Sequence, residues 1–364
     1  MTDVYKVRLD PVGVEFDVEE GETVLDAAFR QGISLPHGCK EGQCAACKCN
    51  LLDGEVDLLK YSTFALNDTE KEEGAILLCR SIAYSDLEVE LLNFDEELLA
   101  KSIPVKDFEG EITNIERLTD DIRGIEIALT APMKFWAGQY ADITVTTKKG
   151  ETITRSFSMA NTPEQTQKLR FIIKKYPEGR FSGELDGGGI EVGSSVRLRG
   201  PFGSSFRREQ RDGPLILVAA GSGMAPIWSI LNDHIASGES RPVHFFYGAR
   251  TQADLFYLDR LAELREKHPE IAFVPVLSHA EDDTAWAGAR GFVHETVAST
   301  LKQLGIAGDG DVYACGPPPM IDALAPVLFM QDFDPERIFF DKFTPSAVSS
   351  EPATVSAPAQ LQAQ

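Results

Sequence analysis

Basic residues and unbroken apolar runs are both scarce in this chain of 364 residues. Lys and Arg number 35 against 57 Asp and Glu, and the resulting net charge of −22 disfavours nucleic acid or an anionic membrane as a partner. The most apolar long stretch, residues 214–231, is interrupted by Gly221, Ser222, Gly223 and Pro226. We therefore expect strand, turn and helix there, and no membrane span. The N-terminus also lacks the apolar core of a signal peptide.

Cysteine and histidine are sparse as well, with six residues of each. So few cysteines argue against a disulfide scaffold and for a reducing cytoplasm. The pair His294-Glu295 lacks the second histidine of a zinc protease motif, and no other His–carboxylate cluster suggests zinc. The length exceeds the ~250–300 residues at which a single core splits, so two or three domains are expected.

The acidic excess is concentrated at the N-terminal end of the chain. Residues 1–100 hold 22 Asp and Glu against 8 Lys and Arg. This acidity has two interpretations: it keeps the protein soluble, or it docks this part of the chain onto a basic partner surface.

Three cysteines follow one another at the spacing Cys39-x4-Cys44-x2-Cys47, and Cys79 lies further along the chain. This is the plant-type [2Fe–2S] spacing, in which a short loop wraps one side of the cluster and a distant cysteine closes it. The alternatives are a zinc site or buried free thiols. Cys49 is interpreted as a small apolar residue entering a strand, and it is the spare ligand if one of the four is misassigned.

The segments around this loop predict a small mixed domain. Residues 4–9 and 12–18 are typical of a hairpin, and Thr23 is a candidate N-cap for a short helix that ends near Gly32. Strands are expected at residues 48–52 and 87–91. Together with Pro36-His37-Gly38-Cys39, this order resembles the β-grasp plant-type ferredoxin.

Short strands with frequent turns follow and suggest a barrel. They are expected at residues 110–118, 124–129, 141–145, 169–174 and 195–199. Arg155-Ser156-Phe157-Ser158 lies among them, and an arginine can bind a pyrophosphate through two hydrogen bonds. With Gly138-Gln139-Tyr140 before it and Gly179-Arg180-Phe181-Ser182 and Gly200-Pro201-Phe202-Gly203 after it, the segment resembles the FAD domain of the ferredoxin–NADP reductase superfamily.

That resemblance implies a set of flavin-binding residues. Ser158 would reach the flavin ring, and Arg155, Ser156 and Ser182 would hold its phosphates. The full implied set is Gln139, Tyr140, Arg155, Ser156, Phe157, Ser158, Ile172, Lys174, Gly179 and Ser182.

A third domain is predicted from the unbroken apolar strand at residues 214–220, which is typical of a buried parallel sheet. The strand runs into Gly221-Ser222-Gly223-Met224-Ala225-Pro226 and then a helix at 227–236, which makes a pyrophosphate site from backbone donors and the helix dipole. Further strands are expected at 243–247 and 271–277. After the first of these, Arg250 could meet a 2′-phosphate and Asp254 a ribose hydroxyl.

The motif Cys315-Gly316-Pro317-Pro318 near the C-terminus completes the resemblance to the reductase superfamily. The resemblance places Cys315 beside the nicotinamide, with Gly316 and Pro317 in the same site, and stacks a C-terminal aromatic on the flavin. Phe343, two residues after Asp341, fits that position, and Phe340 is the alternative. A buried free thiol is the other interpretation of Cys315.

The sequence thus predicts a multidomain α+β and α/β protein. The predicted units are a β-grasp 2Fe–2S ferredoxin domain (1–97), a linker (98–107), an antiparallel β-barrel FAD domain (108–208), a Rossmann-like NAD domain with a parallel sheet (209–345) and a disordered tail (346–364). This order resembles the reductase components of soluble di-iron monooxygenases acting on methane, propane or phenol.

The resemblance implies an NADH:acceptor oxidoreductase that passes electrons from NADH to FAD, to the cluster and then to a hydroxylase docked on the acidic ferredoxin domain. Flavin must stand between the two other carriers, because a nicotinamide gives two electrons together and the cluster accepts one. Two alternatives stay open. One is the reductase of a Rieske ring-hydroxylating dioxygenase, and the other is an iron–sulfur redox sensor.

Overall fold

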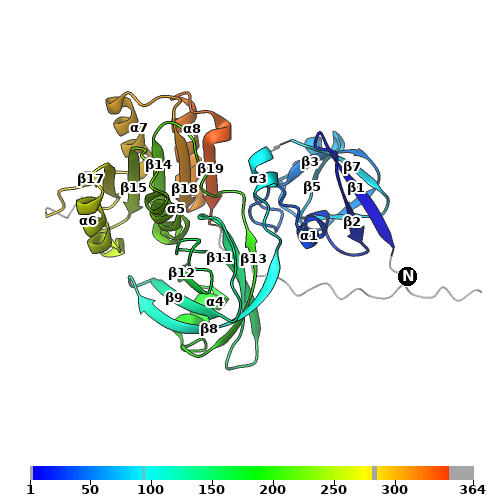
Figure 1. Ribbon diagram of the computed structural model, residues 1–364, viewed down its shortest axis with the longest axis horizontal. Helices are drawn as coiled ribbons and strands as arrows, with labels where there is room; N and C mark the ends of the chain where they lie inside the picture. The colour runs from blue at the N-terminus through cyan, green and yellow to red at the C-terminus, as the bar shows by residue number, and fades with distance from the viewer. Residues whose placement is uncertain (1–2, 93–94, 281–284, 344–364) are drawn as a thin grey trace, which may run out of the picture.

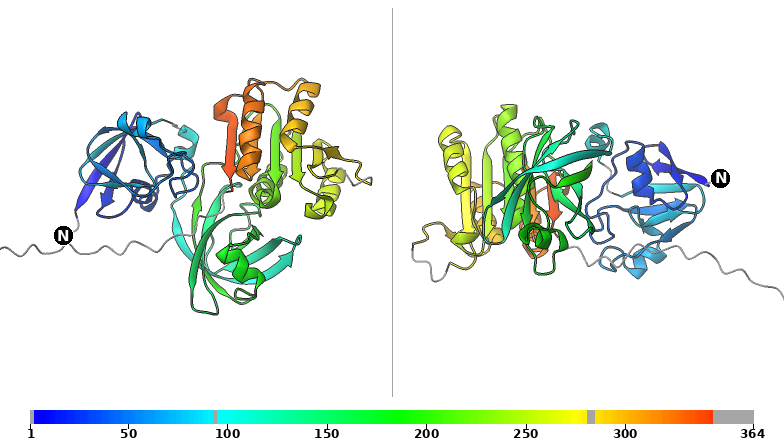
Figure 2. Two further views of the ribbon diagram at one scale, coloured as in Figure 1. Left: turned by 180° about the vertical axis from the view of Figure 1, so that it is seen from behind. Right: turned by 90° about the horizontal axis from the view of Figure 1, so that it is seen from below.

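A computed structural model describes residues 3–92, 95–280 and 285–343. Each of the three predicted units has its own sheet (Figure 1). The N-terminal domain lies beside the barrel domain and the last strand of the chain, and the C-terminal domain stands on the barrel, as the views in Figure 2 also show. The predicted tail at 346–364 lies outside the described residues.

The N-terminal domain is built on a five-stranded mixed sheet in the order β2-β1-β7-β3-β5, with β4 and β6 paired beside it. Helix α1 packs on this sheet through five buried residues, and the Thr23 side chain caps it by accepting from the Asp26 backbone N–H at 3.1 Å. The elements are β1 (Val4–Asp10), β2 (Val14–Glu19), α1 (Val24–Arg30), β3 (Lys48–Asp53), β4 (Val56–Leu58), α2 (Asp68–Glu72), β5 (Ala75–Leu77), β6 (Ser81–Ala83) and β7 (Leu87–Leu91).

The barrel domain is a six-stranded antiparallel sheet in the order β11-β10-β13-β8-β9-β12. A bridge between Met159 and Phe171 joins the two outer strands, so the sheet curls on itself around an apolar interior. Its elements are β8 (Lys106–Arg117), β9 (Ile122–Leu129), β10 (Tyr140–Thr146), β11 (Thr152–Ser158), β12 (Lys168–Lys174), α4 (Arg180–Asp186) and β13 (Ser195–Phe202).

The C-terminal domain is a six-stranded parallel sheet in the order β17-β16-β15-β14-β18-β19. Side chains of β14 (Leu215–Ala220) alternate between two apolar clusters, because successive residues of a strand point to opposite faces. One cluster contains α5, α6 and barrel residues, and the other contains α7 and α8. The remaining elements are η1 (Gly221–Gly223), α5 (Met224–Ser237), β15 (Val243–Ala249), η2 (Gln252–Asp254), α6 (Leu258–Lys267), β16 (Ile271–Leu277), β17 (Ala289–Arg290), α7 (Val293–Leu304), β18 (Asp311–Gly316), α8 (Pro318–Phe329), η3 (Pro335–Arg337) and β19 (Ile338–Lys342).

The predicted fold class is confirmed: a β-grasp domain, an antiparallel barrel and a parallel sheet follow one another. The predicted strands begin and end within four residues of the observed ones. Helices α2, α4, α6 and α7 were not predicted. In the part of the chain that the structure describes, no helix combines the length and the apolar composition that crossing a bilayer requires.

The segment between the first two domains contains a short helix, α3 (Glu96–Ala100), which lies between the N-terminal domain and β19 in Figure 1. Asp95 forms an ion pair with the fully buried Arg208, and Glu97 pairs with Arg211 at 3.0 Å. These contacts tie the segment to the end of the barrel domain. The predicted linker of 98–107 begins inside this helix, and the domain boundaries themselves stay predictions.

Candidate functional site

The four predicted cluster cysteines form two pairs of thiols. The Cys44 thiol donates to Cys39, which lowers the pKa of Cys39 to about 6, and Cys79 donates to Cys47, whose pKa is also lowered. Across the described ranges, no three His, Cys, Asp or Glu side chains surround a single metal-ion position. Two pairs of thiols fit a two-iron cluster with two thiolates on each iron better than one zinc ion.

The backbone of the cluster loop turns its N–H groups toward the sulfurs. Cys39 Sγ accepts from the N–H groups of Glu41 and Gln43 at 3.4 and 3.2 Å, and Cys44 Sγ accepts from Cys39 at 3.3 Å. Such donors stabilise the negative charge of a bound cluster. Glycine is required at position 42 for two reasons. Its φ of +69° lies in the left-handed region, and a Cβ there would lie only 2.8 Å from carbon atoms of Arg80 and Tyr61.

Cys49 lies outside both pairs. It is buried within β3, where it is opposite Ile76 and Leu91 in the neighbouring strands. Burial raises the pKa of its thiol to about 12. The position agrees with the interpretation of Cys49 as a small apolar residue.

Strand β11 carries the predicted flavin motif along the rim of the barrel. Arg155 is half-buried and donates to the Thr154 carbonyl oxygen at 2.7 Å, and within the described residues no carboxylate pairs with it. Most of its donors therefore stay available for phosphate. Phe157 packs edge-on against Phe181 of α4 with ring centroids 4.9 Å apart, and Ser158 is buried at the end of the strand.

Three predicted flavin residues already have protein partners. The Gln139 side chain accepts from Trp136 N at 2.8 Å and donates to the Gly203 carbonyl at 3.0 Å, so its amide fixes the turn before β10. Ser156 donates to Asp142 at 2.6 Å. The Tyr140 hydroxyl donates to the Gly38 carbonyl of the cluster loop at 2.6 Å, which places the ring between the two domains. Their predicted contacts with FAD stay predictions.

The remaining flavin residues lie where β12 and α4 meet the nucleotide turn. Gly179 is the N-cap of α4, and the Ser182 hydroxyl lies inside its first turn, 3.4 Å from the Gly179 carbonyl oxygen. Ile172 is buried against the C-terminal domain. A Cβ on Gly221 would lie 3.9 Å from the Lys174 ammonium, so this lysine stands beside the predicted pyrophosphate turn of NAD.

The predicted nucleotide turn packs directly beneath the predicted nicotinamide strand. Gly221 has a φ of +56°, and Ser222 and Gly223 complete a single 3₁₀ turn that leads into α5. A Cβ on Gly223 would come within 2.2 Å of the Cys315 carbonyl oxygen, so only glycine allows this approach. Pro226 lies in the first turn of α5, where its missing N–H costs no hydrogen bond.

The structure places Arg250 and Asp254 just after β15, but Asp254 has a local role. Its carboxylate accepts from the backbone N–H and the hydroxyl of Thr251, both at 2.9 Å, and so caps η2. Arg250 is exposed and lies 4.0 Å from Asp121 and 3.8 Å from Asp254. Which nucleotide these residues favour stays a prediction.

Cys315 is the penultimate residue of β18, on the face that meets the barrel, and it is almost fully buried. Gly316 follows it, and Pro317 is the N-cap of α8. Phe343 donates its backbone N–H to the Gly316 carbonyl at 2.9 Å and packs on the barrel-facing cluster, whereas Phe340 packs on the opposite face. The geometry therefore favours Phe343 over Phe340 as the aromatic next to a flavin.

Asp341 interacts electrostatically with residues of all three predicted sites. It pairs with Cys315 across β18 and β19 and raises the pKa of that thiol further, after burial. Burial and the nearby Cys39 thiol raise the pKa of Asp341 itself to about 6. Tyr140, which is opposite Ser158 in the barrel sheet, has its pKa raised by burial and by Asp142 and Asp341. Charges of the predicted nicotinamide, flavin and cluster residues therefore act on one another.

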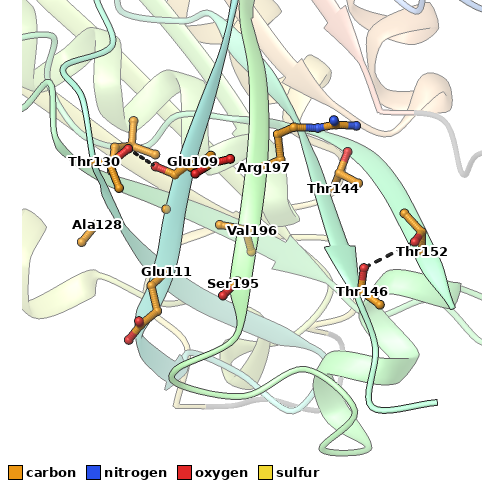
Figure 3. Close-up of a pocket in the computed structure, with 12 residues that line it drawn as sticks. Glu109, Glu111, Ala128, Thr130, Thr144, Thr146, Thr152, Ser195, Val196 and Arg197 are labelled. Atoms are coloured by element: carbon orange, nitrogen blue, oxygen red, sulfur yellow. Dashed lines mark hydrogen bonds between the residues drawn. The ribbon is translucent and has the colours of Figure 1, made fainter. Parts of the chain in front are cut away.

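A separate groove of 820 Å³ lies on the outer face of the barrel sheet (Figure 3). Threonines 144, 146 and 152 line one side of it, and Glu109, Glu111 and Arg197 lie on neighbouring strands. None of its lining residues belongs to the predicted flavin or nucleotide sites. The predicted flavin and nucleotide residues therefore lie apart from this groove.

The residues that hold the cluster loop in place were missed by sequence reasoning. Gly203 donates its N–H to His37 at 2.8 Å, and Lys40 pairs with Asp142 at 2.6 Å. The partners are 166 and 102 residues apart, and no local pattern links them.

Comparison with known families assigns each domain. Residues 7–84 match a 2Fe-2S iron-sulfur cluster binding domain, residues 109–206 an oxidoreductase FAD-binding domain and residues 217–325 an oxidoreductase NAD-binding domain. The protein is therefore an oxidoreductase that uses FAD, a [2Fe–2S] cluster and a nicotinamide nucleotide, as predicted.

Relatives match nearly the whole chain. The reductase component of propane 2-monooxygenase from Mycolicibacterium goodii is 44% identical over 94% of this chain and 98% of its own length. That of phenol 2-monooxygenase from Pseudomonas sp. (strain CF600) is 37% identical over 94% and 95%.

Among solved structures, a cytochrome P450 reductase from Amycolatopsis superposes with a TM-score of 0.81 at 31% identity, covering 94% of this chain and 99% of that one. The ferredoxin reductase in carbazole 1,9a-dioxygenase gives 0.73 at 29% identity, with the same coverage. With relatives of 37–44% identity along nearly its whole length, the chain belongs to the family of reductase components of multicomponent monooxygenases, in which a [2Fe–2S] ferredoxin domain is fused to FAD- and NAD-binding domains.

Proposed function

We propose that this chain is the NADH-dependent reductase of a soluble di-iron monooxygenase and passes electrons from NADH through FAD and the [2Fe–2S] cluster to the hydroxylase. The observation that carries the proposal is that residues of the three predicted sites are in contact. The Tyr140 hydroxyl, opposite Ser158 of the flavin strand, donates to the Gly38 carbonyl of the cluster loop at 2.6 Å, and the Phe343 N–H donates to the Gly316 carbonyl beside Cys315 at 2.9 Å. A route for electrons between three carriers requires such proximity.

Each part of the chain has a distinct task in this route. The Gly221–Gly223 turn and the start of α5 offer backbone N–H groups to the pyrophosphate of the nucleotide, and Cys315 orients the nicotinamide. Arg155 and Ser182 hold flavin phosphates, and Ser158 donates to the edge of the ring. The bound flavin supplies the change from two-electron to one-electron transfer. Cys39, Cys44, Cys47 and Cys79 hold the cluster.

Anaerobic titration of the purified protein with NADH, and separately with NADPH, tests this route. Visible absorption follows the flavin, and electron paramagnetic resonance follows the cluster. We expect flavin bleaching and a rhombic reduced-cluster signal, with NADH the faster donor. A protein with full iron and sulfide whose cluster stays oxidised would contradict the proposal and favour the redox sensor.

Replacement of one guanidinium tests the flavin site. Arg155→Ala should lower the FAD content of the purified protein, because a bidentate phosphate contact is lost. Arg197→Ala, on the exposed outer face of β13, is the matched control and should retain FAD. A fully flavinated Arg155→Ala protein would remove Arg155 from the site.

We further propose that the hydroxylase docks on the acidic N-terminal domain. Cys44 is exposed at the edge of the cluster loop, and the first 100 residues carry most of the acidic excess of the chain. Electron transfer to a di-iron hydroxylase should therefore weaken steeply with added salt, whereas NADH oxidation with ferricyanide should change little.

A Rieske dioxygenase is the second candidate acceptor, because the carbazole dioxygenase reductase shares the whole domain order at a TM-score of 0.73. Side-by-side turnover with a purified di-iron hydroxylase and a purified Rieske dioxygenase separates the two. Faster reduction of the Rieske protein would overturn the di-iron assignment and leave the reductase assignment standing.

A further inference from the structure

The cluster loop is docked on the outer face of the barrel by a compact set of polar contacts. Gly203 N–H donates to His37 Nε2 at 2.8 Å, and the Tyr140 hydroxyl donates to the Gly38 carbonyl at 2.6 Å. Lys40 adds an ion pair to Asp142 at 2.6 Å. Asp142 lies on the same face of β10 as Thr144 and Thr146, because residues two apart along a strand share a face.

Lys40 is the one charged side chain of this set on the loop, and it is well enclosed. It lies between the ligands Cys39 and Cys44, its backbone has a φ of +58°, and its side chain is only 16% exposed. The ammonium lies 3.3 Å from the centroid of the Phe202 ring and 5.3 Å from that of Tyr140. An ion pair with so little solvent is screened far less than a surface pair.

Asp142 connects this lysine to the flavin-binding strand. Its Oδ2 accepts from Lys40, and its Oδ1 accepts from the Ser156 hydroxyl at 2.6 Å. Ser156 lies between Arg155 and Phe157 on β11. One carboxylate therefore joins the loop that holds the cluster to the strand that holds FAD.

We propose that Lys40 is a positioning residue for electron transfer from the flavin to the cluster, acting through Asp142. Electron transfer slows steeply with distance, so a loop carrying two cluster ligands must be held against the flavin domain for rapid transfer. The ion pair fixes the loop at the point where the two redox sites meet. This inference rests on the proposed function, because it concerns the second step of that route.

Three variants of the full-length holoprotein test it: K40M, D142N and the control K148M. D142N removes the carboxylate charge of the ion pair and leaves the lysine charge next to Cys39, while K40M removes the ion pair and the lysine charge together. Lys148 pairs with Glu191 at 2.7 Å on the same barrel, but both side chains are more than half exposed. Stopped-flow absorption separates flavin reduction by NADH from the later reduction of the cluster, and iron, sulfide and FAD contents and the cluster potential are measured on each protein.

We expect K40M and D142N to reduce the flavin at the wild-type rate and the cluster about tenfold more slowly, equivalent to about 1.4 kcal/mol. D142N should keep the wild-type cluster potential, and K148M should match wild type throughout. If the K40M protein does not retain its cluster, the rate of cluster reduction in D142N alone decides the test.

Wild-type cluster reduction in D142N would overturn the inference. A second contradicting result is a K40M protein whose slower cluster reduction is accompanied by a lowered cluster potential, while D142N reduces its cluster at the wild-type rate. The lysine would then act through its charge and not through the ion pair. Neither result resembles failure of the proposed function, in which the wild-type cluster itself is not reduced by NADH.

Discussion

Gly223→Ala tests the contact between the nucleotide turn and the nicotinamide strand. Gly223 has ordinary helical dihedral angles, φ −60° and ψ −11°, so alanine meets no conformational barrier there. The added Cβ would instead lie 2.2 Å from the Cys315 carbonyl oxygen and 2.8 Å from Gly316 N. The first distance is 1.2 Å shorter than the ordinary contact of 3.4 Å. Both neighbours are backbone atoms of β18, so the turn and the strand must separate.

The magnitude follows from that separation. Overpacking of this kind costs about 1–3 kcal/mol of unfolding free energy. Each kcal/mol lowers the Tm by about 2–4 °C in a folded unit the size of the flavin and nucleotide domains together. The turn also moves away from the place where it must meet the pyrophosphate. We expect the KM for NADH to rise at least tenfold, equivalent to about 1.4 kcal/mol, while the FAD content stays at the wild-type level.

Ferricyanide reduction with varied NADH measures KM without involving the cluster, and circular dichroism measures Tm. Gly183→Ala is the matched control, because a Cβ on this glycine of α4 would meet no atom within 4 Å. If Gly223→Ala and Gly183→Ala had the same KM and Tm, close packing would not be what fixes the turn beneath Cys315.

Further predictions concern the cluster, the domain contact and the pH dependence of stability. Cys79→Ser should abolish the reduced-cluster signal in electron paramagnetic resonance, whereas Cys49→Ser should retain it. A cluster retained in the Cys79→Ser protein would exclude Cys79 as a ligand. Tyr140→Phe leaves the Gly38 carbonyl without its donor, so we expect a loss of about 1–3 kcal/mol in denaturant unfolding and slower cluster reduction in stopped flow. Burial lowers the pKa of His234. The unfolded chain therefore binds the proton first as pH falls, and the unfolding free energy should decrease below about pH 6.5. His234→Gln should flatten that decrease in urea titrations, and an unchanged slope would exclude this histidine as its source.

The parts of the site that depend on short-range order were accessible from sequence. Cys39, Cys44 and Cys47 lie in one loop, and the turn at Gly221–Gly223 joins a strand directly to a helix, so spacing and local geometry are enough to predict both. The N-cap at Thr23 is likewise a local signal, and the structure shows the predicted hydrogen bond from the Asp26 N–H.

The contacts between domains could not be predicted in this way. Lys40 and Asp142 each look like an ordinary surface charge in the sequence, and only the docking of one domain on another buries them together. The segment after Gly179 shows a second reason. Its Gly-Arg-Phe-Ser pattern predicts a phosphate contact at Ser182, which stays a prediction, but it gave no sign of helix α4, whose Phe181 and Leu185 pack into the barrel interior.

The short helix α3 determines where this chain can be cut into separately expressed fragments. Severing it at the predicted boundary after residue 97 would leave Asp95 and Glu97 on the N-terminal fragment. The fully buried guanidinium of Arg208 would then lose its carboxylate, a loss of about 3–5 kcal/mol for a buried charge left without a partner. A flavin–nucleotide fragment that begins before Asp95 keeps both pairs, so α3 belongs to the reductase half of the molecule even though the chain enters it from the iron–sulfur half.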